Sequence, residues 1–340
     1  MVKKEKKKPK KKENSIKSTL IVVNDEGENV ESDDAKQEES SFTKHEIKRI
    51  PEAPAITAAA QKHNKKDKTA KPKNKRMLIL FRSAEQMDKI FPEWMHKNFI
   101  DEKYVPTDMN QLIQLPLRKT PLIAYASDPP LTEMGIRISQ LIGKALTEKG
   151  IVISAIYSSP SLRCIQTAQN LIKSQHSSAD LKICIEPAFY NFFGEKQNKL
   201  PIFMSSKELL ENGIPINKDY RPITPKAHLS KFVSETPAEF FRRQSNNVYT
   251  LTKQSPIGTV LIVTHACTMH AIGCELIGKT QHSLNTADMA RVSFNYPYCS
   301  GIALKSSSDG LWDISSQALP ALYSSNFSNR FNYHFLARSG

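Results

Sequence analysis

The fold is decided by residues 151–173, which read IVISAIYSSPSLRCIQTAQNLIK. Ile151 to Tyr157 is an apolar run of strand length, and it predicts a β-strand. Ser161 to Lys173 has helical character, so a helix is expected directly after the strand and a short loop. A strand followed at once by a helix is the repeating unit of α/β folds. The stretch therefore predicts an α/β domain.

The same alternation continues on both sides. Met77 to Phe81 and Thr259 to Val263 are near-continuous apolar runs, as expected of central parallel strands that are covered on both faces. Ile183 to Ile185 indicates a further strand. Helices are expected at Leu131 to Lys149, where apolar residues recur at helical spacing before Gly150, and at Pro237 to Lys253.

The end of the chain adds two closing strands. Gly301 to Lys305 and Leu311 to Ser315 are expected to form an antiparallel hairpin, with Ser306 to Gly310 as its turn. The predicted fold class is therefore α/β, with a mostly parallel central sheet flanked by helices.

The first 75 residues have a different composition. They contain one aromatic residue, Phe42, and they include lysine blocks at Lys3–Lys12 and Lys62–Lys75 around an acidic block at Asp25–Glu39. Such a segment cannot bury enough apolar area to offset its chain entropy, so residues 1–75 are predicted to be a disordered tail and residues 76–340 the folded domain. The short apolar run Leu20–Val23 is the one candidate strand in the tail.

The net charge of +14 is concentrated in this tail, since residues 1–76 alone carry +8. A plain solvated tail is the favoured interpretation; the lysine blocks are also compatible with nuclear import or with binding to a polyanion. Nucleic acid binding by the folded domain is not expected.

The cysteines and the apolar runs bear on the compartment. The five cysteines are not closely paired and mostly lie in apolar stretches, so buried thiols are expected, with neither disulfides nor a zinc site. No apolar segment follows the first lysines, and about 18 uninterrupted apolar residues occur nowhere. We expect a protein of the cytoplasm, or of the nucleus if the lysine blocks act in import, without a membrane span, a metal or a cofactor.

Three predicted strands end in basic residues. Arg82 follows the first strand, Arg163 follows the second, and His265 follows the late strand that ends at Val263. Ligands of open α/β sheets bind at the carboxyl ends of the strands, and Arg163 also lies at the start of a helix, where free N–H groups favour phosphate. Arg82, Arg163 and His265 are therefore candidate ligands of one anion, although each alone is more often a surface charge or a hydrogen-bonded side chain.

At these residues the chain resembles the histidine phosphatase superfamily, which has the phosphoglycerate-mutase-like fold. The similarity is greatest to the phosphatase domains of the suppressors of T-cell receptor signalling, the ubiquitin-associated and SH3 domain-containing proteins, and it spans Arg76 to the C-terminus. The matching motifs are Arg82-Ser83-Ala84-Glu85-Gln86, Asp128 to Leu131 with Gly135, Ser159 to Ala168, Asp219 to Pro222, and Thr264 to Thr268.

The departures from the family pattern concern catalysis. By this resemblance the nucleophilic His falls on Ser83, its neighbouring glycine on Ala84, the second motif Arg on Gln86, and the proton-donating Glu on Asn191. Ala266 also stands where the family has glycine. Two carboxylates lie nearby in the sequence, at positions 186 and 195, but neither falls on the acid position.

The family reaction transfers a phosphoryl group to the imidazole, and an acid protonates the leaving oxygen. A serine hydroxyl needs a general base to attack, and an amide cannot donate the proton, a loss on the order of 10²–10⁴ in rate. The resemblance therefore implies a pseudophosphatase that keeps a partial phosphate pocket at Arg82, Arg163 and His265 and binds a phosphorylated ligand or protein partner.

Two alternatives stay open at this point. One is an active phosphomonoesterase, of the protein tyrosine phosphatase kind, that uses a displaced nucleophile, for which Cys267 and His270 are the nearby candidates. The other is a polyanion-binding adaptor that acts through the basic tail. A homodimer is expected because related phosphatase domains pair.

Overall fold

The computed structural model describes residues 76–175, 181–194, 199–255, 258–279, 285–307, 311–315, 318–324 and 327–338. The predicted tail of residues 1–75, with Leu20–Val23, lies outside the described residues, as do Glu195 and most of the turn Ser306–Gly310.

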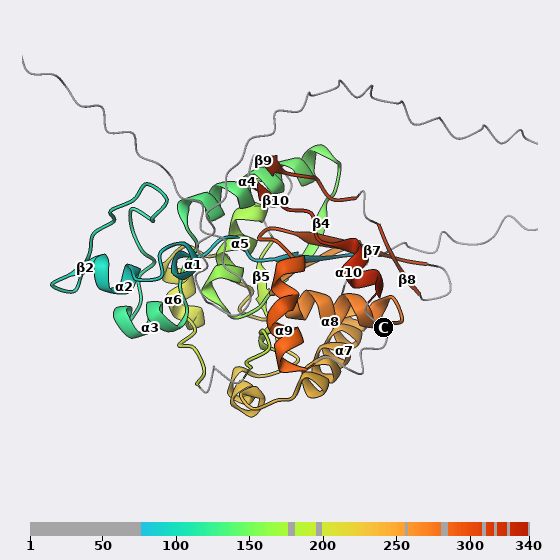
Figure 1. The fold of residues 1–340 in the computed structure, drawn as a ribbon. Coiled ribbons are helices and arrows are strands. Elements are labelled where there is room, and N and C mark those ends of the chain that lie inside the picture. Colours follow the sequence, from blue (N-terminus) through green and yellow to red (C-terminus); the bar gives the residue numbers. More distant parts are fainter. Residues whose placement is uncertain are drawn as a thin grey trace, which may run out of the picture. The chain divides into compact units, whose positions relative to one another are not determined.

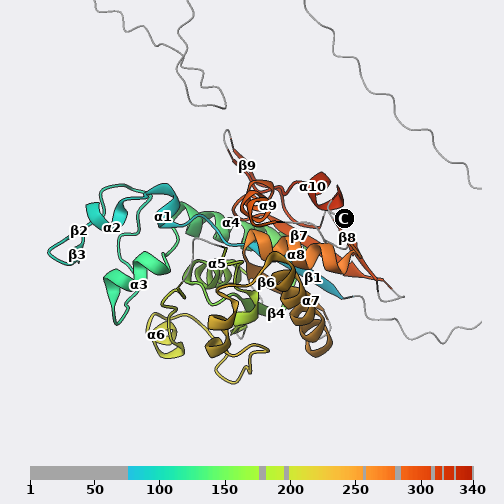
Figure 2. The ribbon, with the colours of Figure 1, turned by 60° about the horizontal axis from the view of Figure 1, so that its bottom comes forward.

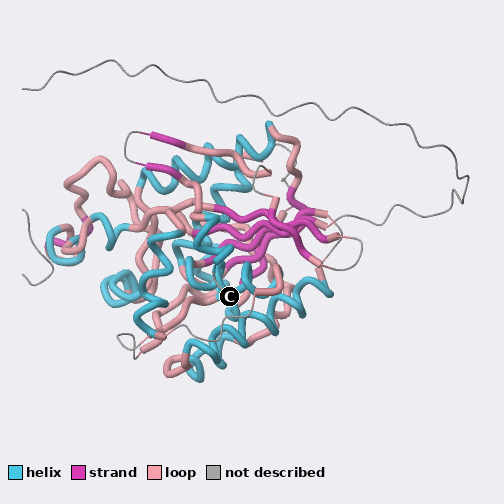
Figure 3. The backbone as a smooth tube through the Cα atoms, turned by 45° about the vertical axis from the view of Figure 1, so that its right-hand side comes forward, coloured by secondary structure: helices cyan, strands magenta, loops and turns pink. Residues whose placement is uncertain are grey.

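The described part is built on a six-stranded sheet with the order β5-β4-β6-β1-β7-β8. Figure 3 shows the strands gathered at the centre with helices around them. The first four strands in this order run parallel, while β7 is antiparallel to β1 and β8 is antiparallel to β7. The strands are β1 (Met77–Arg82), β2 (Phe99–Ile100), β3 (Lys103–Tyr104), β4 (Ile153–Ser158), β5 (Ile183–Ile185), β6 (Thr259–Thr264), β7 (Gly301–Ser306), β8 (Trp312–Ile314), β9 (Tyr323–Ser324) and β10 (Phe327–Ser328).

Helices cover both faces of the sheet (Figure 1). The α-helices are α1 (Met87–Ile90), α2 (Trp94–Lys97), α3 (Pro121–Ser127), α4 (Glu133–Glu148), α5 (Leu162–Lys173), α6 (Ser206–Glu211), α7 (Pro237–Gln254), α8 (Ala266–Leu276), α9 (Thr286–Val292) and α10 (Tyr333–Arg338). The 3₁₀ segments are η1 (Pro187–Phe189), η2 (Lys226–Phe232) and η3 (Ser293–Asn295).

Strand alternation divides the core into two layers. Ile79 and Phe81 of β1 face the layer that α4 and α5 cover, whereas Leu78 and Leu80 face the layer of α7 and α8. A strand buried on both sides needs apolar residues at every position, which is why β1 and β6 are continuous apolar runs in the sequence.

Helices α1 to α3 and the hairpin β2–β3 lie at one end of the sheet, beyond α4 and α5 (Figure 2). Their aromatic side chains form a separate small cluster, in which the Trp94 ring centroid lies 5.9 Å from that of Phe99 and 6.1 Å from that of Tyr125. These short elements were not predicted from the sequence.

The predicted α/β class and the mostly parallel sheet are confirmed. The predicted strands and helices are present with shifts of at most two residues at their ends, and Gly301–Ser306 with Trp312–Ile314 form the expected antiparallel closing pair. All five cysteines are buried free thiols. None of the helices in the described ranges is long and apolar enough to cross a membrane.

Candidate functional site

The loop after β1 is fixed by its backbone. The Arg82 N–H donates to the Ser300 carbonyl at 2.9 Å, and the Ser83 N–H donates to the Thr264 carbonyl, also at 2.9 Å. Ser83 is buried and lies at the carboxyl end of β1, beside the end of β6. The sheet itself therefore places Ser83 at the edge where ligands of α/β folds bind.

The Arg82 side chain is anchored by the segment before β7. Its Nη1 donates to the Ser293 carbonyl at 3.0 Å and to the Tyr296 carbonyl, and its guanidinium carbon lies 4.3 Å from the centroid of the Tyr298 ring. Burial lowers the pKa of Arg82, and the Arg163 charge lowers it further. One of the two predicted anion-binding arginines is thus already engaged by protein carbonyls.

The next residues rest on α5. The buried Ala84 N–H donates to the Thr167 hydroxyl at 2.9 Å, and that hydroxyl donates to the Arg163 carbonyl at 2.7 Å. Burial raises the pKa of the Cys164 thiol to about 12, although hydrogen bonds with Ser159 and Ser83 lower it. Cys164 is therefore a protonated neighbour of Ser83 and not a thiolate.

Arg163 and His265 meet, as the sequence predicted. Arg163 Nη2 lies 3.0 Å from His265 Nδ1, and the Ser159 hydroxyl lies 2.8 Å from His265 Nε2. A guanidinium only donates, so Nδ1 accepts from Arg163 and Nε2 carries the proton that it donates to Ser159. Both ring nitrogens have protein partners, so a phosphate that His265 binds must exchange one of these two hydrogen bonds.

His265 is also neutral. Burial lowers its pKa well below 6.5, and the charges of Arg163, Arg82 and Arg243 lower it further. The ring therefore adds a dipole to the site but no charge.

The N-terminus of α5 is occupied by a protein carboxylate. Asp128, which is fully buried, accepts from the Leu162 N–H at 2.9 Å and 3.2 Å through its two oxygens. One oxygen also lies 3.7 Å from Arg118 Nη1. The predicted free N–H groups at this helix start are therefore partly taken, because the Asp128 side chain reaches Leu162 from the loop before α4.

Glu85 and Gln86 lie on the side of the loop that faces α4. A Glu85 side-chain oxygen accepts from the Thr132 hydroxyl at 2.7 Å and from the Asn110 amide at 2.9 Å, so Glu85 is a structural contact. Gln86 is 8% exposed and pairs through its backbone with Leu131. Its amide has no hydrogen-bond partner among the described residues.

Asn191 follows a segment that is held from two sides. The Phe189 carbonyl accepts from the Thr264 hydroxyl at 2.7 Å, and the Tyr190 ring centroid lies 5.4 Å from that of His265. Asn191 Oδ1 is buried without a partner in the described part of the chain. Asn191 thus directly follows the residue whose ring contacts His265, and no hydrogen bond joins its side chain to Arg163 or Ser83 in the described part of the chain.

Glu186 joins two segments of the chain through hydrogen bonds. Its carboxylate accepts from the Ala188 N–H at 2.9 Å and the Tyr220 hydroxyl at 2.7 Å, and from the N–H groups of Ile223 at 2.6 Å and Thr224 at 3.2 Å. It is fully buried, and burial raises its pKa. It therefore holds the loop before η2 and is not exposed toward the site.

The two displaced-nucleophile candidates are both buried. The Cys267 thiol donates to the Met289 carbonyl at 3.4 Å, and burial raises its pKa to about 12. His270 Nδ1 lies 2.9 Å from the Tyr296 hydroxyl, and its ring packs 4.8 Å from Phe335. Neither side chain makes a contact with Ser83 or Arg163.

The order of these parts on the sheet matches a known family. The sequence model of the histidine phosphatase superfamily, branch 1, covers residues 117–299, which is more than half of the chain. The chain belongs to this superfamily. Within the described ranges of this histidine phosphatase domain, no group of three His, Cys, Asp or Glu side chains could hold a metal ion.

The relatives include ecdysteroid-phosphate phosphatases and ubiquitin-associated and SH3 domain-containing proteins. The chain is 31% identical over 268 residues to ecdysteroid-phosphate phosphatase of Drosophila melanogaster, covering 78% of this chain and 35% of that protein. It is 31% identical over 250 residues to human ubiquitin-associated and SH3 domain-containing protein B, covering 71% and 37% of the two proteins. The chain thus spans about a third of the length of these relatives.

A solved structure supports the fold. The ecdysone phosphate phosphatase of Bombyx mori, crystallised with tungstate, matches with a TM-score of 0.62 and 28% identity over 77% of this chain and 99% of that one. The predicted family is therefore confirmed, and so is the phosphoglycerate-mutase-like α/β architecture.

The histidine phosphatase domain also uses site residues that the sequence did not single out. Ser159, Asp128 and Thr167 lie inside the matching motifs, so their motif positions were the available signal. Tyr298 covers Arg82 from a segment far away in the chain, and no local pattern marks it.

Proposed function

We propose that this chain is a pseudophosphatase, which binds a phosphorylated ligand or protein partner at Arg82, Arg163 and His265 without hydrolysing it. The family resemblance puts Ser83, Gln86 and Asn191 at the positions of the nucleophile, the second arginine and the acid. Together these substitutions remove the attacking nitrogen, one positive charge and the proton donor.

The observation that carries the proposal is the state of His265. Ser83 could attack phosphorus only if a base took its proton, and a base needs a free lone pair. In His265 the Nδ1 lone pair accepts from Arg163, while Nε2 carries a proton. The neighbouring Cys164 thiol is protonated as well. Neither of these two neighbours can therefore serve as the base that Ser83 needs.

Binding is supported by Arg163. A guanidinium has five N–H donors, and the described residues engage one Arg163 nitrogen, Nη2. The remaining donors can form charge-assisted hydrogen bonds to phosphate oxygens. Arg82 adds positive charge nearby, since its field acts on Arg163 and His265.

The proposal also covers the cellular compartment and the oligomeric state. Five buried free thiols are typical of a reducing compartment, so we place the protein in the cytoplasm, with the nucleus as the alternative if the lysine blocks act in import. We also expect a homodimer, and light scattering at micromolar concentration should give twice the mass of the 340-residue chain.

The test uses the full chain in two assays. Incubation with p-nitrophenyl phosphate should give no turnover above background, while calorimetry should detect tungstate binding. Arg163→Ala should weaken tungstate binding about tenfold or more, because charge-assisted hydrogen bonds are lost. The matched control is Arg137→Ala, an exposed arginine on α4, which should leave binding unchanged.

Two results would overturn the proposal. Unchanged tungstate affinity in Arg163→Ala would place the anion elsewhere. Robust turnover that His265→Ala abolishes and Ser83→Ala leaves intact would show an active phosphomonoesterase with a displaced nucleophile.

A further inference from the structure

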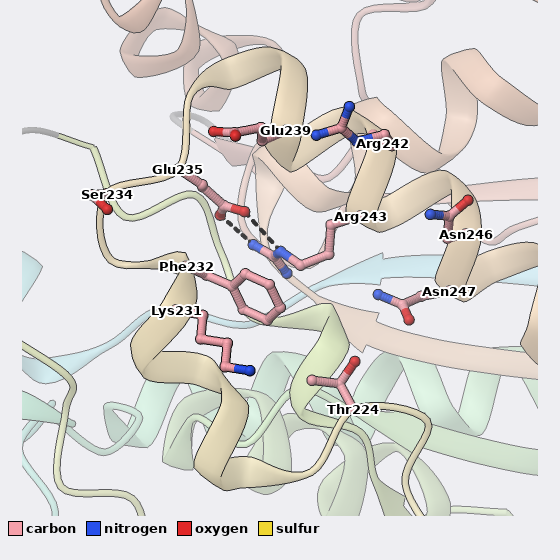
Figure 4. Close-up of a pocket in the computed structure, with 10 residues that line it drawn as sticks. All are labelled: Thr224, Lys231, Phe232, Ser234, Glu235, Glu239, Arg242, Arg243, Asn246 and Asn247. Atoms are coloured by element: carbon pink, nitrogen blue, oxygen red, sulfur yellow. Dashed lines mark hydrogen bonds and ion pairs between the residues drawn. The ribbon is translucent and has the colours of Figure 1, made fainter.

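A hollow lies between η2 and the first half of α7 (Figure 4). It has a volume of about 460 Å³, and its walls are mainly polar. Arg243 lines it and donates through Nη1 to the Ala188 carbonyl at 2.6 Å and the Tyr190 carbonyl at 3.3 Å. The Tyr190 ring in turn contacts His265. The 188–190 backbone thus stands between this hollow and the strand-end site.

The carboxylates of the hollow already have partners. Both Glu235 oxygens accept from Arg243, at 2.9 Å from Nε and 2.5 Å from Nη2. Glu239 Oε2 caps the start of α7 by accepting from the Thr236 N–H at 2.8 Å and its hydroxyl at 2.9 Å. Glu235, Glu239 and Arg243 are therefore engaged within the protein, and what remains for a ligand is mostly donors.

Three of the remaining donors come from different segments. Asn247 on α7 is 6% exposed, yet its side-chain amide has no hydrogen-bond partner in the described part of the chain. The ammonium of Lys231 on η2 and the hydroxyl of Thr224 in the loop before it are likewise unpaired among the described residues. Figure 4 shows the Lys231, Thr224 and Asn247 side chains extending toward the same hollow.

Burial makes the Asn247 amide the most informative of these groups. Its side chain is almost wholly covered, yet its amide atoms are not among the fully buried atoms without a partner, which fits an amide that faces the open hollow. An amide donor beside an unpaired ammonium and a hydroxyl suits an oxyanion, because each of them can donate to it. Arg242 lies on the Glu239 side of the hollow and keeps that wall from being anionic.

We propose that this hollow binds a small hydroxylated phosphate ester of sugar-phosphate size. Its phosphate is held by Lys231, Thr224 and Asn247, and its hydroxyls meet the polar side chains of Ser234 and Asn246. A volume of about 460 Å³ is in the range of small-molecule sites and far exceeds what a bare phosphate fills. The lining side chains are mostly polar, which suits a hydroxylated ligand, and the Phe232 ring offers an apolar contact.

The experiment is calorimetry of the full chain with glucose 6-phosphate as the probe. Lys231→Gln and Asn247→Asp should each weaken binding about tenfold or more, since the first removes a charge and the second replaces a donor with a carboxylate. Lys253→Gln, an exposed lysine near the other end of α7, should bind as the native chain does. Arg163→Ala should also retain binding. Glucose and inorganic phosphate should each bind at least tenfold more weakly.

Several results would overturn this site. They are the absence of binding heat with glucose 6-phosphate, native affinity in both Lys231→Gln and Asn247→Asp, and equal affinity for glucose or for inorganic phosphate. Loss of binding in Arg163→Ala alone would assign the ligand to the strand-end site, which rejects this proposal and leaves the proposed function standing. Unchanged thermal melting of Lys231→Gln separates lost binding from lost folding.

Discussion

His265 shows how the residues of the site balance one another. Its ring is buried, accepts a hydrogen bond from a guanidinium and donates one to a hydroxyl, so the neutral form is stabilised. The same two hydrogen bonds occupy the groups that would serve as base and phosphate donor in an active enzyme. Stability and catalysis therefore make opposite demands on this side chain.

We predict that His265 does not titrate between pH 8 and 6 in the ligand-free protein. Burial is the larger cause of its lowered pKa and the Arg163 charge the next, so Arg163→Ala should raise the pKa toward 6.5. Imidazole NMR shifts measured against pH test both statements. A midpoint near 6.5 in the native chain would contradict the neutral assignment.

The lowered pKa of His265 also makes the free energy of unfolding depend on pH. The unfolded chain protonates this histidine near pH 6.5, whereas the folded chain does not, so the unfolded state binds more protons below that value. The contribution of His265 to folding stability is therefore complete above about pH 6.5 and is lost as the pH falls.

A separate prediction concerns the restoration of activity. Ser83→His alone should recover little turnover of p-nitrophenyl phosphate, because leaving-group protonation and phosphoryl charge stabilisation still lack the groups that Asn191 and Gln86 replace. The triple variant Ser83→His, Gln86→Arg, Asn191→Glu should be the smallest active set. If the triple variant folds but stays inactive, the result would indicate that the methyl groups of Ala84 and Ala266, where the family has glycine, obstruct the phosphate.

At the residue scale, the sequence predicted that Arg163 and His265 lie close together. It did not predict that they hydrogen-bond to each other or that Ser159 bonds to His265. The predicted strand ends give the backbone positions of these residues. The carboxyl ends of parallel strands lie at the same edge of the sheet, so the residues were expected close together. The pairing of donors with acceptors depends on side-chain orientation, as in the hydrogen bonds of Ser159 with His265 and of Asp128 with Leu162. The spacing of apolar residues in a sequence does not predict such orientations.

Helices α4 and α5 pack through a close backbone approach. A Cβ atom added at Gly143 would overlap the Leu171 carbonyl group, so only glycine fits there at the present distance between the helices. Gly135 has the same role against the Glu85 carbonyl. These contacts set how near α4 lies to α5 and to the loop that follows β1.

Gly143→Ala should destabilise the domain by about 1–3 kcal/mol, because the helices must separate to accept the methyl group. Urea unfolding followed by circular dichroism measures this. Lys144→Ala, on the exposed face of the same helix, should change stability by less than about 0.5 kcal/mol. Equal values for the two variants would show that the helices are not held by this contact.

Asp128 links α5 to the loop before α4. Asp128→Ala should cost about 1–3 kcal/mol at pH 7, because the Leu162 N–H loses its acceptor and Arg118 loses its counter-charge while it keeps its carbonyl partners. Asp128→Asn should cost less, since an amide oxygen still accepts from Leu162. Chemical unfolding of both variants tests the ranking, and an equal cost would mean that the helix cap contributes nothing.

The Asp128 charge also predicts a pH trend. Burial raises its pKa to about 6 in the folded protein, above the unfolded value near 3.9, so the folded state binds more protons in between. This contribution to stability is complete below about pH 4 and is lost as the pH rises to 6. Asp128→Asn should remove that trend.

Among the elements, the long ones were predictable and the short ones were not. β1 and β6 contain runs of five and four apolar residues, and α4 and α7 carry helical spacing over 16 and 18 residues. β2 and β3 have two residues each, which is too short for any period, and they exist because their aromatic residues pack on Trp94.

For the whole molecule, residues 1–75 are predicted to be dispensable for folding, because their composition offers no core. Limited proteolysis of the full chain should leave a stable fragment that begins near residue 75, and its melting temperature should match that of the intact protein. A protected fragment from the first 75 residues would contradict this prediction.

The hydrogen bond between Arg163 and His265 also sets a timescale. An oxyanion that takes the N–H that Nη2 donates to His265 must displace the imidazole, so binding through that N–H should be slower than binding through the other Arg163 donors. On departure the internal bond re-forms at once, so release leaves no orphaned donor and residence should be brief. With brief residence, the fraction of protein that carries ligand follows the ligand concentration closely.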